Sequence, residues 1–212
     1  MSYGFPFKRK KSNAPAIDHR TYETGLHVFA DGACEPNPGP GGWAFVVFKN
    51  GDEIHAERGC SPQTTNNIME MTGALRALEW LAKNCPDRQA SLHCDSQYVV
   101  NGCNDWRHSW KSKGWKRGKE EVKNLALWQL LDAALERYPL RLAWCKGHAG
   151  IKGNERADAL SVEAMRNVTV TLQTRYANIT SRDTPRNSAE SAEFREDGGD
   201  YLTRKFREIM TE

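Results

Sequence analysis

The sequence lacks any apolar run approaching the ~20 residues that a membrane-spanning helix needs, and its first residues contain no signal-peptide apolar core. We therefore expect no membrane contact and a cytoplasmic protein. An excess of charge of one sign is also missing, since 30 Lys and Arg face 27 Asp and Glu. The resulting net charge of +3 says little about partners unless the positive residues gather in particular segments.

Paired cysteines are absent as well. The six cysteines stand singly, and no two form a CxxC motif, so a zinc ribbon is excluded. A chain of 212 residues can bury a sizeable core without disulfides. Buried thiols in a reducing compartment are therefore the simpler interpretation, and a disulfide framework is the alternative.

Low hydrophobic content, 39%, beside an ordinary 27% of charged residues indicates a folded domain diluted by polar ends. We expect a flexible basic arm at residues 1–24, one folded catalytic domain at 25–166 and a polar extension at 167–212. The extension should be largely disordered. Within it, residues 168–176 alternate like a strand, and residues 201–210 have the pattern of a short amphipathic helix.

Hydrophobic periodicity predicts an α/β fold with a mixed sheet. The expected strands lie at 26–30, 42–49, 53–59, 91–95 and 140–145, and the turn signal NGD joins the second and third into a hairpin. A first amphipathic helix is expected in NNIMEMTGALRALEWLAKN, a second at 122–138, and a last one after a polar loop at 146–155. The first and fourth strands need a helical crossover, so we expect them to be parallel.

Both of those strands end in an aspartate, Asp31 and Asp95. Ligands of open α/β sheets bind beyond the carboxyl ends of the strands. Glu70 in the first helix and Asp158 in the last helix supply two further acids on separate elements. Four acids that meet in a partly dry site repel one another unless cations neutralise them, and hard oxygen ligands select Mg²⁺ or Mn²⁺.

Each of these acids also has a plain structural interpretation. Asp31 and Asp95 could be turn residues, Glu70 could belong to a capping box closed by Asn67, and Asp158 could lie on a solvated helix face. Turn and cap chemistry does not explain why the four should converge.

The segment WRHSWKSKGWKRGK at 106–119 combines three tryptophans with six Lys and Arg and contains no acid. Trp106 and Trp110 can share one helical face, and Gly114 permits a turn that presents Trp115. So many cations resist burial, so we expect something outside the core to meet these rings, with Trp110 the one most suited to filling the core.

Five stretches, DGACEPNPGPGG, TTNNIMEM, DSQYV, WRHSWKSKGWK and KGHAGIKGNERAD, resemble in order and spacing the motifs of type 1 ribonuclease H. The resemblance covers about residues 26–165. It implies a five-stranded mixed sheet flanked by helices and an endonuclease that cuts the RNA strand of RNA·DNA hybrids, leaving 5′-phosphate and 3′-hydroxyl ends. It also implies two Mg²⁺ ions per site with substrate, or Mn²⁺ in their place, and we expect a monomer.

The resemblance assigns roles residue by residue. Asp31, Glu70, Asp95 and Asp158 match the four metal-binding carboxylates, and His148 matches a mobile-loop histidine that handles protons. Four amides match positions that contact 2′-hydroxyls and bases in the minor groove, namely Asn37, Asn66, Asn67 and Gln97. Thr65 and Asn124 match a pocket for a DNA phosphate. Trp106, Lys111, Lys113, Trp115 and Lys116, with Arg117 and Lys119, match a basic protrusion that meets the DNA strand.

Three positions depart from the family pattern: Ala30, Gln63 and Ile68. They bear on affinity for the DNA strand and not on the chemistry.

Two other functions stay open, a binding module on the same scaffold and a nuclease or recombinase acting on DNA alone. The intact carboxylates disfavour the first, and the hydroxyl-reading amides disfavour the second. The basic run KRKK at 8–11 is either a tether for nucleic acid or an inert tail.

Overall fold

The structure, a computed structural model, describes residue 22, residues 24–87 and residues 89–182. The chain divides into two compact units, Met1–Val170 and Thr171–Glu212. The segment KRKK and the helix expected at 201–210 lie outside the described residues. Within the described part of the chain, no helix is long and apolar enough to cross a membrane.

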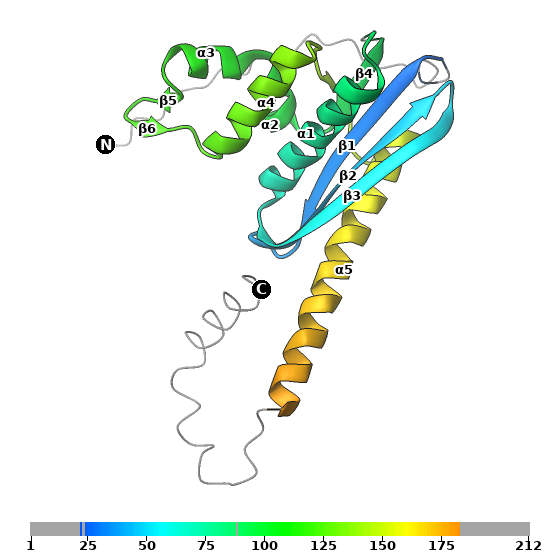
Figure 1. The fold of residues 1–212 in the computed structure, drawn as a ribbon, viewed down its shortest axis with the longest axis vertical. Helices are drawn as coiled ribbons and strands as arrows, with labels where there is room; N and C mark the ends of the chain where they lie inside the picture. Colours follow the sequence, from blue (N-terminus) through cyan, green and yellow to red (C-terminus); the bar gives the residue numbers. More distant parts are fainter. Residues whose placement is uncertain (1–21, 23, 88, 183–212) are drawn as a thin grey trace. The chain divides into compact units, whose positions relative to one another are not determined.

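Five strands form one mixed sheet in the order β3-β2-β1-β4-β7 (Figure 1). The strands are β1 (Leu26–Cys34), β2 (Gly39–Lys49), β3 (Asp52–Thr64), β4 (Ala90–Cys94) and β7 (Ala143–Trp144). β1 runs antiparallel to β2 and parallel to β4, and β7 runs parallel to β4. Both the expected five-stranded mixed sheet and the parallel pairing of the first and fourth strands are confirmed.

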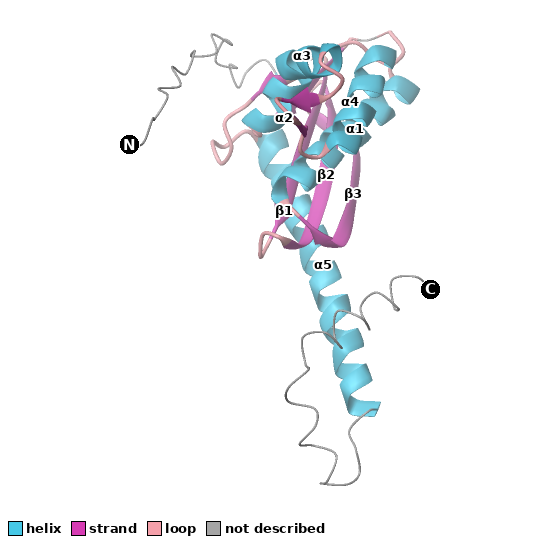
Figure 2. Cartoon of the chain, turned by 90° about the vertical axis from the view of Figure 1, so that its left-hand side faces the viewer, coloured by secondary structure: helices cyan, strands magenta, loops and turns pink. Residues whose placement is uncertain are grey.

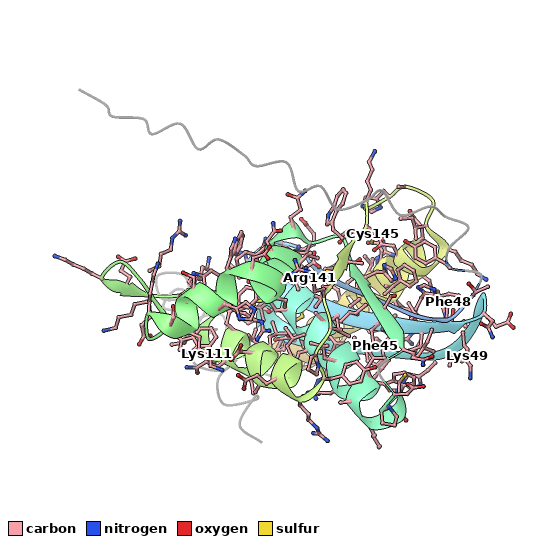
Figure 3. The ribbon with its side chains drawn as sticks, turned by 90° about the horizontal axis from the view of Figure 1, so that it is seen from above. Phe45, Phe48, Lys49, Lys111, Arg141 and Cys145 are labelled. Carbon is pink, nitrogen blue, oxygen red and sulfur yellow. The ribbon has the colours of Figure 1, made fainter. Side chains whose placement is uncertain are left out.

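The hairpin between β2 and β3 follows from two residues. Asn50 and Gly51 both have positive φ, 52° and 87°, which matches the type I′ turn that Asn-Gly favours. Side chains of β2 then alternate between the two faces of the sheet: Phe45 joins the core on one face and Phe48 the core on the other (Figure 3).

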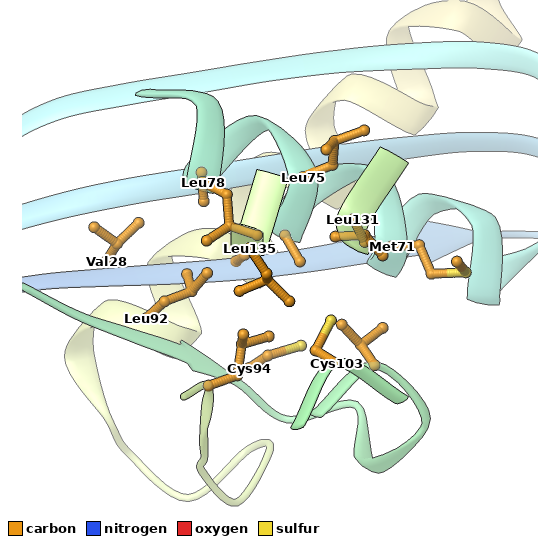
Figure 4. Close-up of a cluster of buried hydrophobic side chains, with 14 of the residues drawn as sticks. Val28, Met71, Leu75, Leu78, Leu92, Cys94, Cys103, Leu131 and Leu135 are labelled. Atoms are coloured by element: carbon orange, nitrogen blue, oxygen red, sulfur yellow. The ribbon is translucent and has the colours of Figure 1, made fainter. Parts of the chain in front are cut away.

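Helices cover both faces of the sheet (Figure 2). Helices α1 (Asn66–Asn84) and α4 (Leu125–Arg137) build the larger core with β1 and β4, and Figure 4 shows Val28 and Leu92 of these strands near Leu78 and Leu135 of the helices. Helix α5 (Lys152–Arg182) covers the opposite face with its first turns. The expected amphipathic helices are therefore present.

A segment of short helices and a small hairpin follows β4 and lies outside the five-stranded sheet. It consists of α2 (Gln97–Asn101), a π-helical turn η2 (Gly102–Trp106), α3 (Arg107–Ser112) and a hairpin of β5 (Lys116–Arg117) with β6 (Glu120–Glu121). Residues 106–119 of this segment are called the basic protrusion below.

The structure differs from the sequence pattern in two details. Residues 168–176, whose alternation resembles that of a strand, lie inside α5, and the last strand is two residues long where six were expected. Between Asn154 and Arg182 the chain has no Gly or Pro that would end a helix. Once a helix has begun, each added residue adds a hydrogen bond at little cost, so α5 continues through the alternating segment.

Candidate active site at the carboxyl ends of β1 and β4

Asp31 and Asp95 meet because their strands are parallel neighbours in register. Phe29 of β1 pairs with His93 of β4, so both acids stand two residues beyond a paired position. Asp31 is 5% exposed, and its Oδ1 accepts a hydrogen bond of 2.7 Å from the amide of Gly32.

Glu70 approaches the strand ends because α1 touches β1 backbone to backbone. A Cβ atom on Gly32 would lie 2.2 Å from the Glu70 nitrogen, and one on Gly73 would lie 2.8 Å from the Asp31 carbonyl oxygen. Two glycines facing this contact therefore let the fifth residue of α1 enter the site.

Asp158 arrives from the opposite face of the sheet, on α5. Its carboxyl group lies close enough to that of Asp31 to share a hydrogen bond. The charges of Asp95 and Asp158 both act on Asp31, and those of Asp31 and Asp95 act on Glu70. The structure thus brings the four acids together around Asp31.

The crowding changes the acidity of these groups. Burial, then the charge of Asp95 and the contact with Asp158, raises the pKa of Asp31 to about 8. Burial, then the charges of Asp31 and Asp95, raises the pKa of Glu70 well above its usual value. Without a cation Asp31 keeps its proton near neutral pH, and a hard divalent ion bound by these oxygen donors would displace that proton.

Ligand atoms of Glu70, Cys94 and Asp95 all lie within 4.8 Å of one another, a spacing that one metal ion could span. The thiol of Cys94 donates a hydrogen bond of 3.7 Å to Oε2 of Glu70, while the Asn66 amide donates one of 3.4 Å to Oε1. Both oxygens of Glu70 are therefore held by neutral donors.

Asp95 has a neutral donor of its own. Nδ2 of Asn154 donates a hydrogen bond of 3.2 Å to Oδ2 of Asp95. Cys94 and Asn154 are site residues that the sequence motifs did not indicate. The available signal was the spacing of Asn154 and Asp158, four residues apart on one helix face.

His148 is exposed on the loop that links β7 to α5, with φ of 50°. Gly147 packs against the site, since a Cβ atom there would lie 2.5 Å from Oδ2 of Asp95, and Gly150 has φ of 76°. The imidazole thus stands one residue beyond a close contact with Asp95, on a loop with unusual backbone angles.

Two of the four amides expected to read the substrate, Asn37 and Asn66, are linked by hydrogen bonds to Glu70 of this site. Asn37 is exposed between Pro36 and Pro38, and its Oδ1 accepts a hydrogen bond of 3.2 Å from the backbone amide of Asn66. Asn67 in α1 and Gln97, the first residue of α2, are exposed.

Thr65, and neither asparagine, is the N-cap of α1, with its hydroxyl 3.4 Å from the Ile68 nitrogen. The capping box proposed as an alternative for Glu70, and the capping roles proposed for Asn66 and Asn67, are therefore not what these side chains do. Asn124, the other expected phosphate ligand, is the N-cap residue before α4, with φ of 62°, and donates weak hydrogen bonds to Tyr98 and to Met71 of α1.

The three tryptophans of the basic protrusion form a graded series from surface to core. Trp106 is 39% exposed and packs on Trp110, whose ring lies 5.2 Å from the fully buried Trp128. Trp115, with φ of 62°, is partly buried on the same core. Trp110 therefore fills the edge of the core as expected, while Trp106 presents an indole to solvent.

Lys111 and Arg107 differ from the other basic residues of the protrusion, because carboxylates of α4 already bind them. The ammonium group of Lys111 lies 2.7 Å from Asp132 and also contacts Glu136. Arg107 pairs with the same buried Asp132. Lys113 and Lys116 are exposed, and so are Arg117 and Lys119.

Comparisons with known proteins agree with this geometry. The RNase H family model matches residues 23–166. Ribonuclease H of Bradyrhizobium sp. (strain ORS 278) is 50% identical over 137 residues, which are 64% of this chain and 86% of the relative. Ribonuclease HI of Caulobacter vibrioides is 49% identical over 140 residues, 66% of this chain and 91% of the relative.

Solved structures show the same fold. LC9-RNase H1, a type 1 RNase H with the type 2 active-site motif, is 31% identical with a TM-score of 0.60, covering 68% of this chain and 74% of its own. LC11-RNase H1 in complex with RNA/DNA hybrid is 22% identical with a TM-score of 0.52, covering 68% and 99%. The chain therefore belongs to the ribonuclease H family, as a protein of the bacterial type 1 form.

Proposed function

We propose that the protein is an endoribonuclease that hydrolyses the RNA strand of RNA·DNA hybrids, using two Mg²⁺ ions and leaving 5′-phosphate and 3′-hydroxyl ends. The observation that carries this proposal is the meeting of Asp31, Glu70, Asp95 and Asp158 at the strand ends. A binding protein gains nothing from four clustered acids beside a phosphate backbone, whereas metal-assisted hydrolysis needs them. The hybrid bound to LC11-RNase H1 supports the choice of substrate.

Each carboxylate has a distinct position in this proposal. Glu70 and Asp95 would hold one ion, Asp158 would hold the second, and Asp31, which lies among the other three, would contribute to both. When bound, the ions lower the pKa of the attacking water and stabilise the leaving oxygen. Mn²⁺ can substitute because it accepts the same oxygen ligands.

His148 manages protons at the edge of the site. Its exposed position on a loop beside Asp95 suits a group that takes a proton from the water side and returns it to solvent. One chain supplies every residue of the site, so a monomer suffices for catalysis.

Recognition of the hybrid divides between its two strands. Asn37, Asn66, Asn67 and Gln97 offer donors and acceptors to the 2′-hydroxyls that distinguish RNA from DNA. Thr65 and Asn124 grip a DNA phosphate. In the basic protrusion, Trp106 and Trp115 contact the DNA strand, while Lys111, Lys113 and Lys116 meet its phosphates and release counterions.

Incubation of end-labelled hybrid, duplex RNA and duplex DNA with the full chain tests the proposal, with Mg²⁺ and then with EDTA. We expect Mg²⁺-dependent cleavage of the hybrid alone, with 5′-phosphates on the fragments. Asp31→Asn should lose cleavage, and Asp52→Asn, at the exposed hairpin turn, should keep it. Binding without cleavage would instead identify a binding module, and cleavage of duplex DNA would identify a DNA nuclease. Normal cleavage by Asp31→Asn would overturn the metal assignment.

A further inference from the structure

Asn154, near the start of α5, is a polar residue that is almost fully buried, with 1% of its surface exposed. Both ends of its amide have partners. Nδ2 donates to Oδ2 of Asp95 at 3.2 Å, and Oδ1 accepts from the thiol of Cys145, also at 3.2 Å. Cys145 is itself 2% exposed and lies next to α5 (Figure 3).

The chemistry of these three groups permits one orientation of the amide. A carboxylate only accepts hydrogen bonds, so it must face the NH₂ end of Asn154. The other end then needs a donor, and the thiol of Cys145 is the donor at that position. A reversed amide would place Oδ1 against the carboxylate oxygen of Asp95, which is repulsive.

Residues shortly before Asn154 also hold the main chain at Asp95 and at its neighbour Cys94. The indole nitrogen of Trp144 donates a hydrogen bond of 2.9 Å to the carbonyl oxygen of Asp95. The amide of Cys145 donates one of 3.1 Å to the carbonyl oxygen of Cys94. Residues 144–154 therefore fix both the main chain around Asp95 and its side chain.

We propose that Asn154, oriented by Cys145, is a positioning residue that fixes the carboxylate of Asp95 in the direction from which it binds a divalent cation. This inference rests on the metal-dependent function proposed above. Partners of metal ligands at this distance commonly change metal affinity by about 10- to 100-fold when they are removed. Without the thiol the amide can reverse, and without the amide the carboxylate can rotate.

Calorimetric titration tests the positioning role of Asn154 directly. The full chain is titrated with Mg²⁺ and with Mn²⁺ in the absence of substrate. Asn154→Ala should weaken binding by about 10-fold. Cys145→Ala should weaken it in the same direction, and Cys145→Ser, which keeps a donor, should restore it to within about 3-fold of the original protein. A merely structural role for the thiol would not produce that rescue.

Cys85→Ala is the matched control. Cys85 is another buried thiol that donates to a carboxylate, Asp87, but it lies at the far end of α1 from Glu70. We expect this variant to lose some thermal stability and to keep its metal affinity.

The possible results distinguish a failure of the proposed function from a failure of the positioning role of Asn154. If the unaltered chain binds neither ion and does not cleave hybrid, the proposed function fails. If the unaltered chain binds metal and Asn154→Ala binds it equally well, the positioning role fails alone. Should Asn154→Ala not fold, Asn154→Ser and the two Cys145 variants decide: equal affinity in Cys145→Ala and Cys145→Ser overturns the proposal.

Discussion

Gly32 lies directly against the main chain of Glu70: a Cβ atom on Gly32 would stand 2.2 Å from the Glu70 nitrogen and 2.3 Å from the carbonyl carbon of Met69. Both contacts are with backbone, so no side chain can move aside. The distance between Asp31, which precedes Gly32, and Glu70 is thus set by the absence of a single methyl group.

Gly32→Ala should therefore separate α1 from β1 and move Glu70 away from Asp31. We expect a loss of about 1–3 kcal/mol in the free energy of unfolding, from overpacking, together with a fall in cleavage rate at temperatures where the variant is folded. Urea unfolding and hybrid cleavage measure the two effects. Gly32 does not have positive φ, so its substitution reports the backbone contact alone. Gly118→Ala, whose Cβ would meet nothing within 4 Å, should show only the cost of alanine at its φ of 71°. Unchanged cleavage by a folded Gly32→Ala would contradict this account.

The raised pKa of Asp31, about 8, makes the metal-free protein less stable as pH rises. The folded state retains a proton that the unfolded chain has lost above its usual pKa of 3.8, so stability falls between about pH 4 and pH 8. Asp31→Asn cannot ionise. In EDTA it should match the original protein near pH 4 and exceed its Tm at pH 8 by at least about 3 °C.

Thermal unfolding from pH 4 to pH 9 measures this difference. Saturating Mg²⁺ should reverse the order at pH 8, because the ion stabilises only the chain whose carboxylate binds it. A lower Tm for Asp31→Asn in EDTA at pH 8 would show that Asp31 is ionised and paired in the metal-free fold.

The position of the carboxylates could be predicted from the sequence because it follows from topology. A helical crossover makes β1 and β4 parallel, and each strand has an aspartate two residues beyond their last shared pair, so both acids lie at the same edge. The hairpin at Asn50 and Gly51 could also be predicted, because its signal is local: the Asn-Gly dipeptide strongly favours the type I′ turn.

The supporting contacts could not be predicted because they join residues far apart in the chain. The hydrogen bond from Asn154 to Asp95 spans 59 positions, and nothing in either residue's neighbourhood indicates the other. In the sequence Lys111 likewise has no acidic partner nearby, but in the fold Asp132 of α4 lies beside it. The strand-like alternation at 168–176 was misleading for a different reason. A helix that has already formed continues at little cost per residue, and alternation of residue types carries no information about that.

His148→Ala should lower kcat about 100-fold while leaving KM within about 3-fold, because the imidazole moves protons and does not hold the hybrid. Activity should remain, since the carboxylate cluster stays intact. Added imidazole should restore part of the rate. His55→Ala, on the edge strand β3, is the control that should cleave normally. A His148→Ala chain as inactive as Asp95→Asn would instead place His148 among the indispensable residues.

The salt dependence of binding distinguishes cations that meet phosphates from cations that already have partners. Lys116 is exposed in the basic protrusion, whereas Lys111 is bound by Asp132 and Glu136. Hybrid affinity measured in EDTA from 50 to 200 mM NaCl should show a slope of log K against log salt reduced by about 0.9 in Lys116→Ala, one phosphate contact.

Lys111→Ala should reduce that slope less, because a phosphate must first displace the two carboxylates from the ammonium group. Lys83→Ala, at the last turn of α1, should leave the slope unchanged. If Lys111→Ala reduced the slope as much as Lys116→Ala, bound nucleic acid would be breaking the ion pairs with α4. The Arg107–Asp132 pair would then be the ion pair that still joins α3 to α4, beside the packing of Trp110 on Trp128, and Asp132→Asn should weaken hybrid binding further.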